Sequence, residues 1–494
     1  MSRLGPGALV WAGFDGPEVP GPLLDAIRTG ALGGLLLFAV RGNVRSKEQV
    51  RAMLADAVGA ARRGGLPAVP VAVDQEGGTV VRVAYRAVFP SAMAIAATGD
   101  PAYAERAARA VAEGLRADGI TVNHAPVCDV NAEPRNPVIG IRSFGDDPER
   151  VAGFVAAWVR GSEGAGVATT PKHFPGHGMT AYDTHHTTVD VDDDAATLRA
   201  RDLVPFRAAF GAGATMVMTA HIRYPAFDPD RVATLSRPIL TRLLRDELGF
   251  DGLSITDSLD MTGVTQVEDP TRVAGTAIAA GIDAVMVTSG LERQLAAAER
   301  IALDAPAPRV LEALRRATVF RERFAGTIAE GDVDDGPARA LAMKIARASI
   351  TRVGPSLPRI GGALRVTGFA PRRVGGADEL RDPLGRLEAA LRARVGDRLV
   401  FERDGREPSG DGPLVVCTST AWHDAQQADR ARVLLRDGGV LCALRSPYDA
   451  ALFPDRPALL TYGDVPASID ALAAVLCGER AATGRLPVTL PGAE

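Results

Sequence analysis

The sequence predicts an α/β protein in which an N-terminal (β/α)8 TIM barrel is followed by a smaller C-terminal α/β sandwich domain. Two observations lead to this fold class. Eight short apolar runs rich in β-branched residues occur within residues 8–289, and segments with helical periodicity separate most of them. Strands buried on both faces read as near-continuous apolar runs, and their alternation with helices implies parallel pairing. A closed barrel is the simplest arrangement that satisfies both observations.

The predicted barrel strands follow one another at regular intervals. They are the runs ALVWAG (8–13), GGLLLF (33–38), VPVAVD (69–74), ITVNHAP (120–126), VATTPKH (167–173), TMVMTAH (215–221), GLSITDS (252–258) and AVMVTS (284–289). The helix expected before the seventh run has clear end signals. Ser236 precedes RPILTRLLRDELG, where an early Pro and a terminal Gly bracket an amphipathic stretch.

A second α/β pattern begins beyond the barrel. The helical segment ARALAMKIARAS leads into VGPSLPRIGG, which is typical of a linker. Four more strand-like runs, ALRVTGF, LVVCTST, GVLCALR and ALLTYG, then alternate with helical segments. We therefore expect a catalytic barrel over residues 1–330, a helical linker over 331–361 and a C-terminal α/β domain over 362–494.

Composition narrows the class of partner. The 494 residues carry a net charge of -4, with acidic and basic residues interspersed, so no broad basic surface is expected for nucleic acid or an anionic membrane. No apolar segment approaches the roughly twenty residues of a membrane helix, and the N-terminus lacks a secretory leader pattern. We expect a cytoplasmic protein that binds a small molecule. Its four cysteines lack metal-site spacing and are expected to be reduced core residues: Cys128, Cys417, Cys442 and Cys477.

Polar residues end several of the predicted barrel strands. Asp74 ends the third run, Lys172 and His173 the fifth, His221 the sixth and Asp257 the seventh. Active sites of such barrels form at the carboxyl ends of the strands, so these side chains are expected at one rim. Asp257 as a helix cap and His221 as a satisfied core histidine are the ordinary alternatives.

Two reaction classes fit this rim. One is a metal-dependent hydrolase that draws its ligands from His173, His177, His185, His186 or His221. The other is glycosyl transfer, in which a carboxylate attacks the anomeric carbon while a second group protonates the leaving oxygen. Pro175 and Gly176 separate two of the histidines, so these need not face one centre as they would on a helix. We therefore expect no metal and no other cofactor.

Longer motifs along almost the whole chain resemble those of glycoside hydrolase family 3. The resemblance is to its two-domain β-N-acetylglucosaminidase branch, of the type that releases N-acetylglucosamine from peptidoglycan fragments during recycling. The motifs are DQEGGTVVR, NHAPVCDVN, NPVIGIRSFGDDP, KHFPGHGMTAYDTHH, VMTAHIRYPAFD, ATLSRPILTRLLRDELGFDGLSITDSLDM, LRSPYDAALFP and GRLPVTLPG.

The resemblance implies a role for each of three catalytic residues. Asp257 would be the nucleophile that forms a covalent glycosyl intermediate, with net retention. His185, on the loop after the fifth strand, would be the acid/base, and Asp183 would orient its ring. The glycines and proline of KHFPGHGMTAYDTH are expected to let this loop carry the pair over the bound sugar.

The same resemblance implies a set of substrate contacts. Asp74 would accept hydrogen bonds from sugar hydroxyls, and Arg82, Arg142, Lys172 and His173 would donate to them.

Less specific roles are weighed beside these contacts. Arg82 and Arg142 are also typical salt-bridge formers, and Glu76 is expected to be a structural acid. His177 is expected to stabilise its loop, and His186 to have no catalytic role.

Some positions depart from the family pattern, and the second domain lacks a motif around an acidic residue. Ser258 follows the nucleophile, and Met179 and Tyr182 lie in the loop, where the family commonly has other residues. These changes flank the catalytic residues and leave the preference for the leaving group open. We expect the second domain to be a structural buttress or a homodimer surface.

The predicted function is that of a retaining β-N-acetylglucosaminidase acting on muropeptides or small glycosides. The alternatives are a β-glucosidase or broad β-hexosidase of the same family, with phosphorolysis as a side activity, and an inactive sugar-binding protein. The presence of both Asp257 and His185 argues against the inactive alternative.

Overall fold

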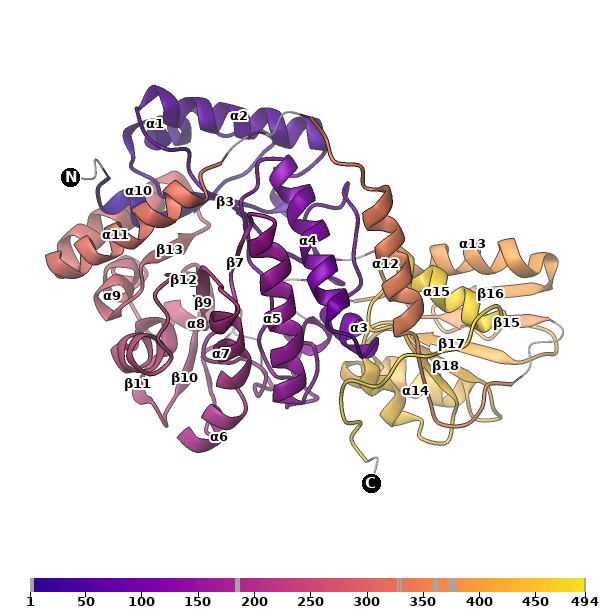
Figure 1. The fold of residues 1–494 in the computed structure, drawn as a ribbon. Helices are drawn as coiled ribbons and strands as arrows, with labels where there is room; N and C mark the ends of the chain where they lie inside the picture. The colour runs from indigo at the N-terminus through magenta and orange to yellow at the C-terminus, as the bar shows by residue number, and fades with distance from the viewer. Residues whose placement is uncertain are drawn as a thin grey trace.

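The computed structural model describes residues 4–182, 187–326, 328, 331–358, 363–372, 378–379 and 381–492. Within them the chain forms two α/β halves, each built on its own sheet (Figure 1). Helix α12 (Gly336–Ser349) runs along the boundary between the two halves.

The first half is a parallel barrel, as the sequence predicts. Its strands are hydrogen-bonded in the order β7-β6-β3-β2-β1-β13-β12-β9. They are β1 (Val10–Gly13), β2 (Gly34–Leu37), β3 (Val71–Val73), β6 (Val122–Asn123), β7 (Ala168–Thr169), β9 (Met216–Thr219), β12 (Leu253–Ser258) and β13 (Ala284–Val287). Each predicted run contains one strand. The amide of Phe174 donates to the carbonyl of Met218 at 2.8 Å, which brings the chain after β7 against β9 and nearly closes the barrel.

Helices cover the outside of the barrel (Figure 1). They are α1 (Gly21–Thr29), α2 (Lys47–Arg63), α3 (Ala92–Ala97), α4 (Ala102–Ala117), α5 (Pro148–Gly164), α6 (Ala195–Ala200), α7 (Leu203–Gly211), η5 (Pro238–Glu247), α8 (Thr262–Thr265), α9 (Val273–Ala280), α10 (Leu291–Asp304) and α11 (Ala307–Arg323). Side-chain caps begin several of them, such as Ser46 before α2 and Asp147 before α5. Ser236 accepts from the Ile239 amide at 3.2 Å as the sequence predicts, although η5 has a π-helical pattern.

Short strands and turns supplement the barrel, and a hairpin lies at its carboxyl end. The hairpin of β4 (Gln75–Gly77) and β5 (Val80–Val81) follows β3 directly. A small sheet joins β8 (Val189–Asp190), β10 (Ile222–Tyr224) and β11 (Asp228–Val232). Tight 3-10 turns complete this half: η1 (Pro6–Leu9), η2 (Ala39–Arg41), η3 (Gly140–Arg142) and η4 (Ala233–Leu235).

The second half has a sheet of order β14-β19-β18-β17-β15-β16, in which only β14 is antiparallel to its neighbour. The strands are β14 (Thr351–Val353), β15 (Leu364–Gly368), β16 (Leu399–Arg403), β17 (Leu414–Thr418), β18 (Val440–Ala443) and β19 (Ala458–Leu460). The helices are α13 (Pro383–Val395), α14 (Ala425–Leu434) and α15 (Pro466–Leu476), with 3-10 turns η6 (Gly396–Arg398), η7 (Ala421–His423) and η8 (Pro447–Leu452).

The four predicted runs of this half form β15, β17, β18 and β19, but two strands were not predicted. The sequence of β16, LVFER, ends in charged residues and is only half buried. Strand β14 lies within the expected linker, yet it joins the second sheet at its edge. The domain boundaries at 330 and 361 stay a prediction.

A shared apolar cluster holds the two halves together. Met93 and Ile141 from the barrel pack in one buried group with Leu460 and Tyr462 from the second half. The C-terminal tail then returns to the barrel. The Arg485 amide donates to the Ala97 carbonyl at 2.7 Å, and the Thr489 amide donates to Asp146 at 2.6 Å. The second half is therefore attached to the barrel both at α12 and at the end of the chain.

Two expectations from composition can be compared with the structure. All four cysteines are free thiols, and three of them are buried while Cys477 is half buried. Among the described residues, no helix combines the length and the apolar character needed to cross a bilayer.

Replacing Gly34 with Ala should destabilise the barrel, because an added Cβ would lie 2.4 Å from the buried Trp11 ring. We expect the urea midpoint of unfolding to fall by an amount equivalent to roughly 1–3 kcal/mol. Gly153→Ala is the matched control: it lies inside α5 with nothing within 4 Å of its added Cβ, so it should leave the midpoint unchanged or raise it. Equal midpoints for the two variants would contradict the packing described here.

Candidate active site

A cavity of about 470 Å³ lies at the carboxyl ends of the barrel strands. Asp74 follows β3, Lys172 and His173 follow β7, and Asp257 lies near the end of β12. Arg82 and Arg142 also line the cavity. The structure thus brings six of the eight predicted site residues around one space.

Lys172 is the centre of a buried charge cluster in this cavity. Its ammonium nitrogen lies 2.7 Å from an oxygen of Asp74 and 2.7 Å from an oxygen of Glu76. Arg142 binds the same Glu76 carboxylate in a bidentate manner, through Nε at 2.8 Å and Nη2 at 2.9 Å. Glu76 is therefore a structural acid, as expected, that holds two of the predicted substrate-binding cations.

These pairs keep the cluster ionised. Burial by itself raises the pKa of both carboxyls, but the neighbouring cations outweigh it: Lys172 holds the pKa of Asp74 well below its usual range, and Arg142 and Lys172 lower that of Glu76 to about 2. Burial by itself lowers the pKa of Lys172, yet its two carboxylate partners raise it overall.

Both cations keep hydrogens that their partners do not use. An ammonium has three hydrogens, and the two carboxylate partners of Lys172 use at most one each, so one remains for a ligand. Arg142 uses a third donor on the Val138 carbonyl at 3.1 Å, which leaves one hydrogen on each terminal nitrogen.

Asp129 fixes the start of the loop after β7. Its buried carboxylate accepts from the backbone amides of His173 at 3.1 Å and His177 at 2.7 Å, and it lies 2.8 Å from His173 Nδ1. A carboxylate accepts hydrogen bonds, so Nδ1 carries a hydrogen and Nε2 is the ring nitrogen left to face the cavity. The structure places His173 on the cavity wall with Nδ1 held by Asp129, and its predicted hydrogen bond to a sugar hydroxyl through Nε2 stays a prediction.

Other histidines of the rim have structural partners. The Nδ1 of His177 lies 2.8 Å from the Thr180 hydroxyl, and its carbonyl accepts from Asn136, which agrees with the expected loop-stabilising role. His221 lies between the Thr234 hydroxyl at 2.8 Å and the Ser258 carbonyl at 3.0 Å. This histidine is the satisfied core residue of the ordinary alternative.

Asp257 is half buried at the edge of the cavity. One of its oxygens accepts from the Ser258 amide at 2.7 Å. The other acid of the ITDSLDM motif, Asp260, is instead bound by the amides and hydroxyls of Thr288 and Ser289, each at 2.8 Å. Both acids line the cavity, but the oxygens of Asp260 are taken up by the loop of Thr288 and Ser289, whereas the hydrogen bond of Asp257 to Ser258 involves one of its two oxygens.

Two acids of the second half lie at this rim, one lining the cavity and one pairing with a residue that lines it, and sequence reasoning missed both. Asp378 lines the cavity, and Glu379 accepts from Arg82 Nη1 at 2.9 Å. The Glu379 amide also donates to the Thr79 carbonyl at 2.9 Å. The second half thus contributes Asp378 to the wall of the cavity, and Arg82 uses one donor on Glu379.

The signals for the missed residues are weak in the sequence. Asp129 stands in the family motif NHAPVCDVN, after a predicted strand, and an acid in a buried run is a usable signal. Asp378 and Glu379 stand in no motif. The predicted pair Asp183 and His185, and also His186, lie outside the described residues, so their roles stay predictions.

A parallel barrel with a carboxylate-lined cavity at its carboxyl rim has the arrangement of an enzyme active site, and glycoside hydrolysis by a pair of acidic groups is one chemistry that it fits. Residues 23–318 match the description "Glycosyl hydrolase family 3 N terminal domain". The chain belongs to glycosyl hydrolase family 3.

Known relatives agree with this membership. The chain is 38% identical over 289 residues to Beta-hexosaminidase A of Pseudoalteromonas piscicida, across 54% of this chain and 48% of that protein. It therefore spans about half the length of this relative. It is also 38% identical over 290 residues to Beta-hexosaminidase of Pseudomonas aeruginosa (strain LESB58), across 57% of this chain and 83% of that protein.

A solved structure extends the likeness to both halves. It is the glycoside hydrolase family 3 beta-N-acetylglucosaminidase from Paenibacillus sp. str. FPU-7, which superimposes with a TM-score of 0.88 at 31% identity. The superposition covers 98% of each chain. The predicted family and fold class are confirmed.

His124 should make the stability of the protein depend on pH. Burial lowers its pKa to about 4, from 6.5 for an exposed histidine. Below pH 6.5 the unfolded chain therefore binds a proton that the folded chain does not take up until about pH 4. The contribution of His124 to stability is complete above that range and is lost as the pH falls through it, by about 3 kcal/mol in total.

Urea midpoints measured from about pH 7 down to about pH 4 test this contribution. The decline should be clearly shallower in His124→Gln, which keeps a polar side chain without titrating. Burial also lowers the pKa of His177 to about 4. Both proteins contain this histidine, so its contribution to the pH dependence is the same in each. Parallel curves for the two proteins would contradict the assignment.

Proposed function

We propose that the chain is a retaining β-N-acetylglucosaminidase that releases terminal β-linked N-acetylglucosamine from muropeptides or small glycosides. The observation that carries this proposal is the position of Asp257, on the wall of the 470 Å³ cavity that also holds the Lys172 cluster. Relatives named beta-hexosaminidase and a solved beta-N-acetylglucosaminidase support the choice of sugar.

In this proposal Asp257 attacks C1 of the sugar while the bond to the leaving oxygen breaks. His185 gives its proton to that oxygen, which leaves as a hydroxyl group. His185 then takes a proton from water as the water attacks C1, and the bond to Asp257 breaks. Two displacements at C1 give net retention, and Asp183 orients the imidazole throughout.

The charge cluster supplies the contacts of the sugar. Asp74, held ionised by Lys172, accepts from hydroxyls of the ring. The remaining hydrogens of Lys172 and Arg142 donate to sugar oxygens, and Arg82 and His173 donate to further hydroxyls. Because these groups are fixed by their carboxylate partners before the sugar arrives, little side-chain ordering remains to oppose binding. The cytoplasmic location and the absence of a metal or other cofactor stay predictions.

Asp257→Ala should lower kcat/KM for 4-nitrophenyl N-acetyl-β-glucosaminide by roughly 10³-fold or more, because no covalent intermediate can form. Asp251→Ala, which removes an exposed carboxylate from the loop before β12, is the control and should retain activity. Wild type should turn over the acetamido sugar in preference to the matching β-glucoside, and chelator should have no effect. Preference for the glucoside would favour the β-glucosidase alternative, and loss of activity in chelator would favour the metal-dependent one.

His185→Ala should affect substrates according to their leaving group. Aryl glycosides with a good leaving group need little protonation, so their bond-breaking step should slow only modestly. Substrates with a poor leaving group, such as alkyl glycosides, should slow by roughly 10²-fold or more. The rate of the first chemical step, measured before steady state, separates this effect from breakdown of the intermediate. Equal losses on both classes would make His185 a binding residue.

A further inference from the structure

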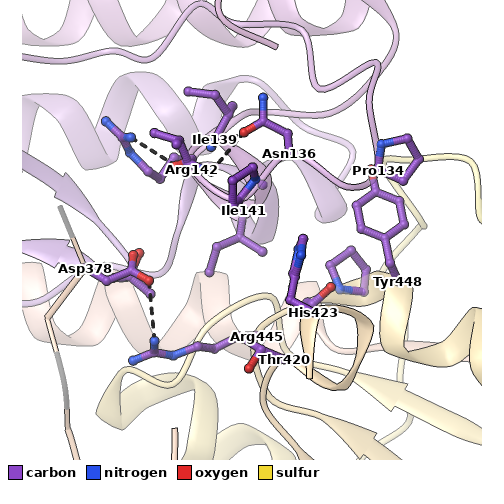
Figure 2. A pocket seen from close by; sticks show the side chains of 16 residues that line it. Pro134, Asn136, Ile139, Ile141, Arg142, Asp378, Thr420, His423, Arg445 and Tyr448 are labelled. Carbon is purple, nitrogen blue, oxygen red and sulfur yellow. Dashed lines mark hydrogen bonds and ion pairs between the residues drawn. The ribbon is translucent and has the colours of Figure 1, made fainter. Parts of the chain in front are cut away.

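A short segment of the second half, which follows β15, lies against the barrel hairpin of β4 and β5. The Glu379 amide donates to the Thr79 carbonyl of this hairpin at 2.9 Å. On the other side Arg445, which is buried, donates to the Glu379 carbonyl at 3.0 Å and forms an ion pair of 3.7 Å with Asp378 (Figure 2). The backbone at Glu379 is therefore held by contacts that do not involve its side chain.

The Glu379 side chain has one arginine at each carboxylate oxygen. Its Oε1 accepts from Arg82 Nη1 at 2.9 Å, and its Oε2 lies 3.6 Å from Arg381 Nη2. Arg381 is held in turn, because its Nη1 donates to the Gly78 carbonyl at 2.8 Å. The side chains of Arg82 and Glu379 are only 8% and 17% exposed, so water screens this pair little. An acid from outside the barrel thus sets the position of the Arg82 guanidinium.

Arg82 lines the 470 Å³ cavity together with Asp74. Burial raises the pKa of Asp74, but the positive charges of Lys172 and, less strongly, Arg82 hold it well below its usual range. The two groups therefore lie close enough to attract each other. Within the described residues, however, the ion pair of Arg82 is with Glu379, and no ion pair joins it to Asp74.

The attraction between Arg82 and Asp74 has a consequence if Glu379 is removed. Opposite charges in a shielded cavity attract strongly, and an arginine side chain can reorient about several single bonds. Lys172 donates to one of the two Asp74 oxygens. Without Glu379, the guanidinium would turn to the Asp74 carboxylate.

We propose that Glu379 is a positioning residue that keeps Arg82 apart from Asp74, so that both groups can bind a sugar in the cavity. A direct pair between the two would have to break before the sugar could bind, and this would weaken binding. The inference rests on the proposed function and assigns part of the sugar affinity to the second half.

Glu379→Ala should weaken the binding of N-acetylglucosamine, measured by titration calorimetry, by roughly 10-fold, because a charge-assisted contact that prepares the site is lost. With 4-nitrophenyl N-acetyl-β-glucosaminide, KM should rise by a similar factor while kcat changes by less than about 3-fold, since Arg82 contacts the sugar in both the ground and the transition state. Glu379→Gln keeps an oxygen at the same position and should bind within about 3-fold of wild type. A fall in kcat at unchanged KM would contradict the proposed role.

A double-mutant cycle separates positioning from a general structural role. Arg82→Ala removes the group that Glu379 positions, so adding Glu379→Ala in that background should change sugar binding by less than about 2-fold. Equal losses from Glu379→Ala in the two backgrounds would show that Glu379 does not act through Arg82.

Two further variants complete the comparison. Glu388→Ala is the matched control: it removes another glutamate of the second half, on α13, which accepts from Arg392 at 3.1 Å, and it should leave KM and sugar binding unchanged. Glu379→Asp keeps the charge but withdraws it by one methylene group, and it should weaken binding by roughly 3-fold. This variant keeps the test decisive even if Glu379→Ala does not fold.

The outcomes distinguish the positioning role from the proposed function. If wild type neither binds N-acetylglucosamine nor releases it from a substrate, the proposed function fails and the positioning role with it. If wild type binds the sugar and Glu379→Ala and Glu379→Asp bind it equally well, the positioning role alone is wrong.

Discussion

The contact on which the site depends is the Lys172 ammonium between Asp74 and Glu76. Buried charges are tolerated only when they are matched, so the chain after β7 and the hairpin after β3 must meet with little freedom. Glu76 also pairs with Arg142, so the loop after β6, which carries Arg142, must lie against the same cluster. Three separate loops of the barrel rim are thus positioned by one arrangement of charge.

Further ion pairs extend this order beyond the barrel strands. Asp129 fixes the first part of the loop after β7 through two backbone amides and the His173 ring. Arg82 reaches Glu379 and so links the rim to the second half. The carboxyl ends of the strands of two sheets face each other across this link, where the 470 Å³ cavity adjoins a smaller one lined by Thr420 and Arg445 (Figure 2).

The sequence predicts most of the fold because buried parallel strands leave a local signature, as GLLL in β2 and AVMV in β13 do. It does not predict β16, whose LVFER mixes apolar and charged residues, or the short edge strand β14. Contacts are harder to predict than elements. Arg82 and Glu379 are 297 positions apart, so nothing local indicates that they pair. The orientation of the His173 ring likewise depends on Asp129, 44 positions away.

The path of the polypeptide between the halves has a mechanical consequence. The chain leaves the barrel at α12 and returns to it near the C-terminal end. There the Arg485 amide bonds to Ala97, just before α4, and the Thr489 amide bonds to Asp146, just after η3. A domain that is attached at two places cannot rotate freely about a single hinge, because rotation at one attachment would strain the other. The two attachments therefore oppose rigid-body separation of the two halves.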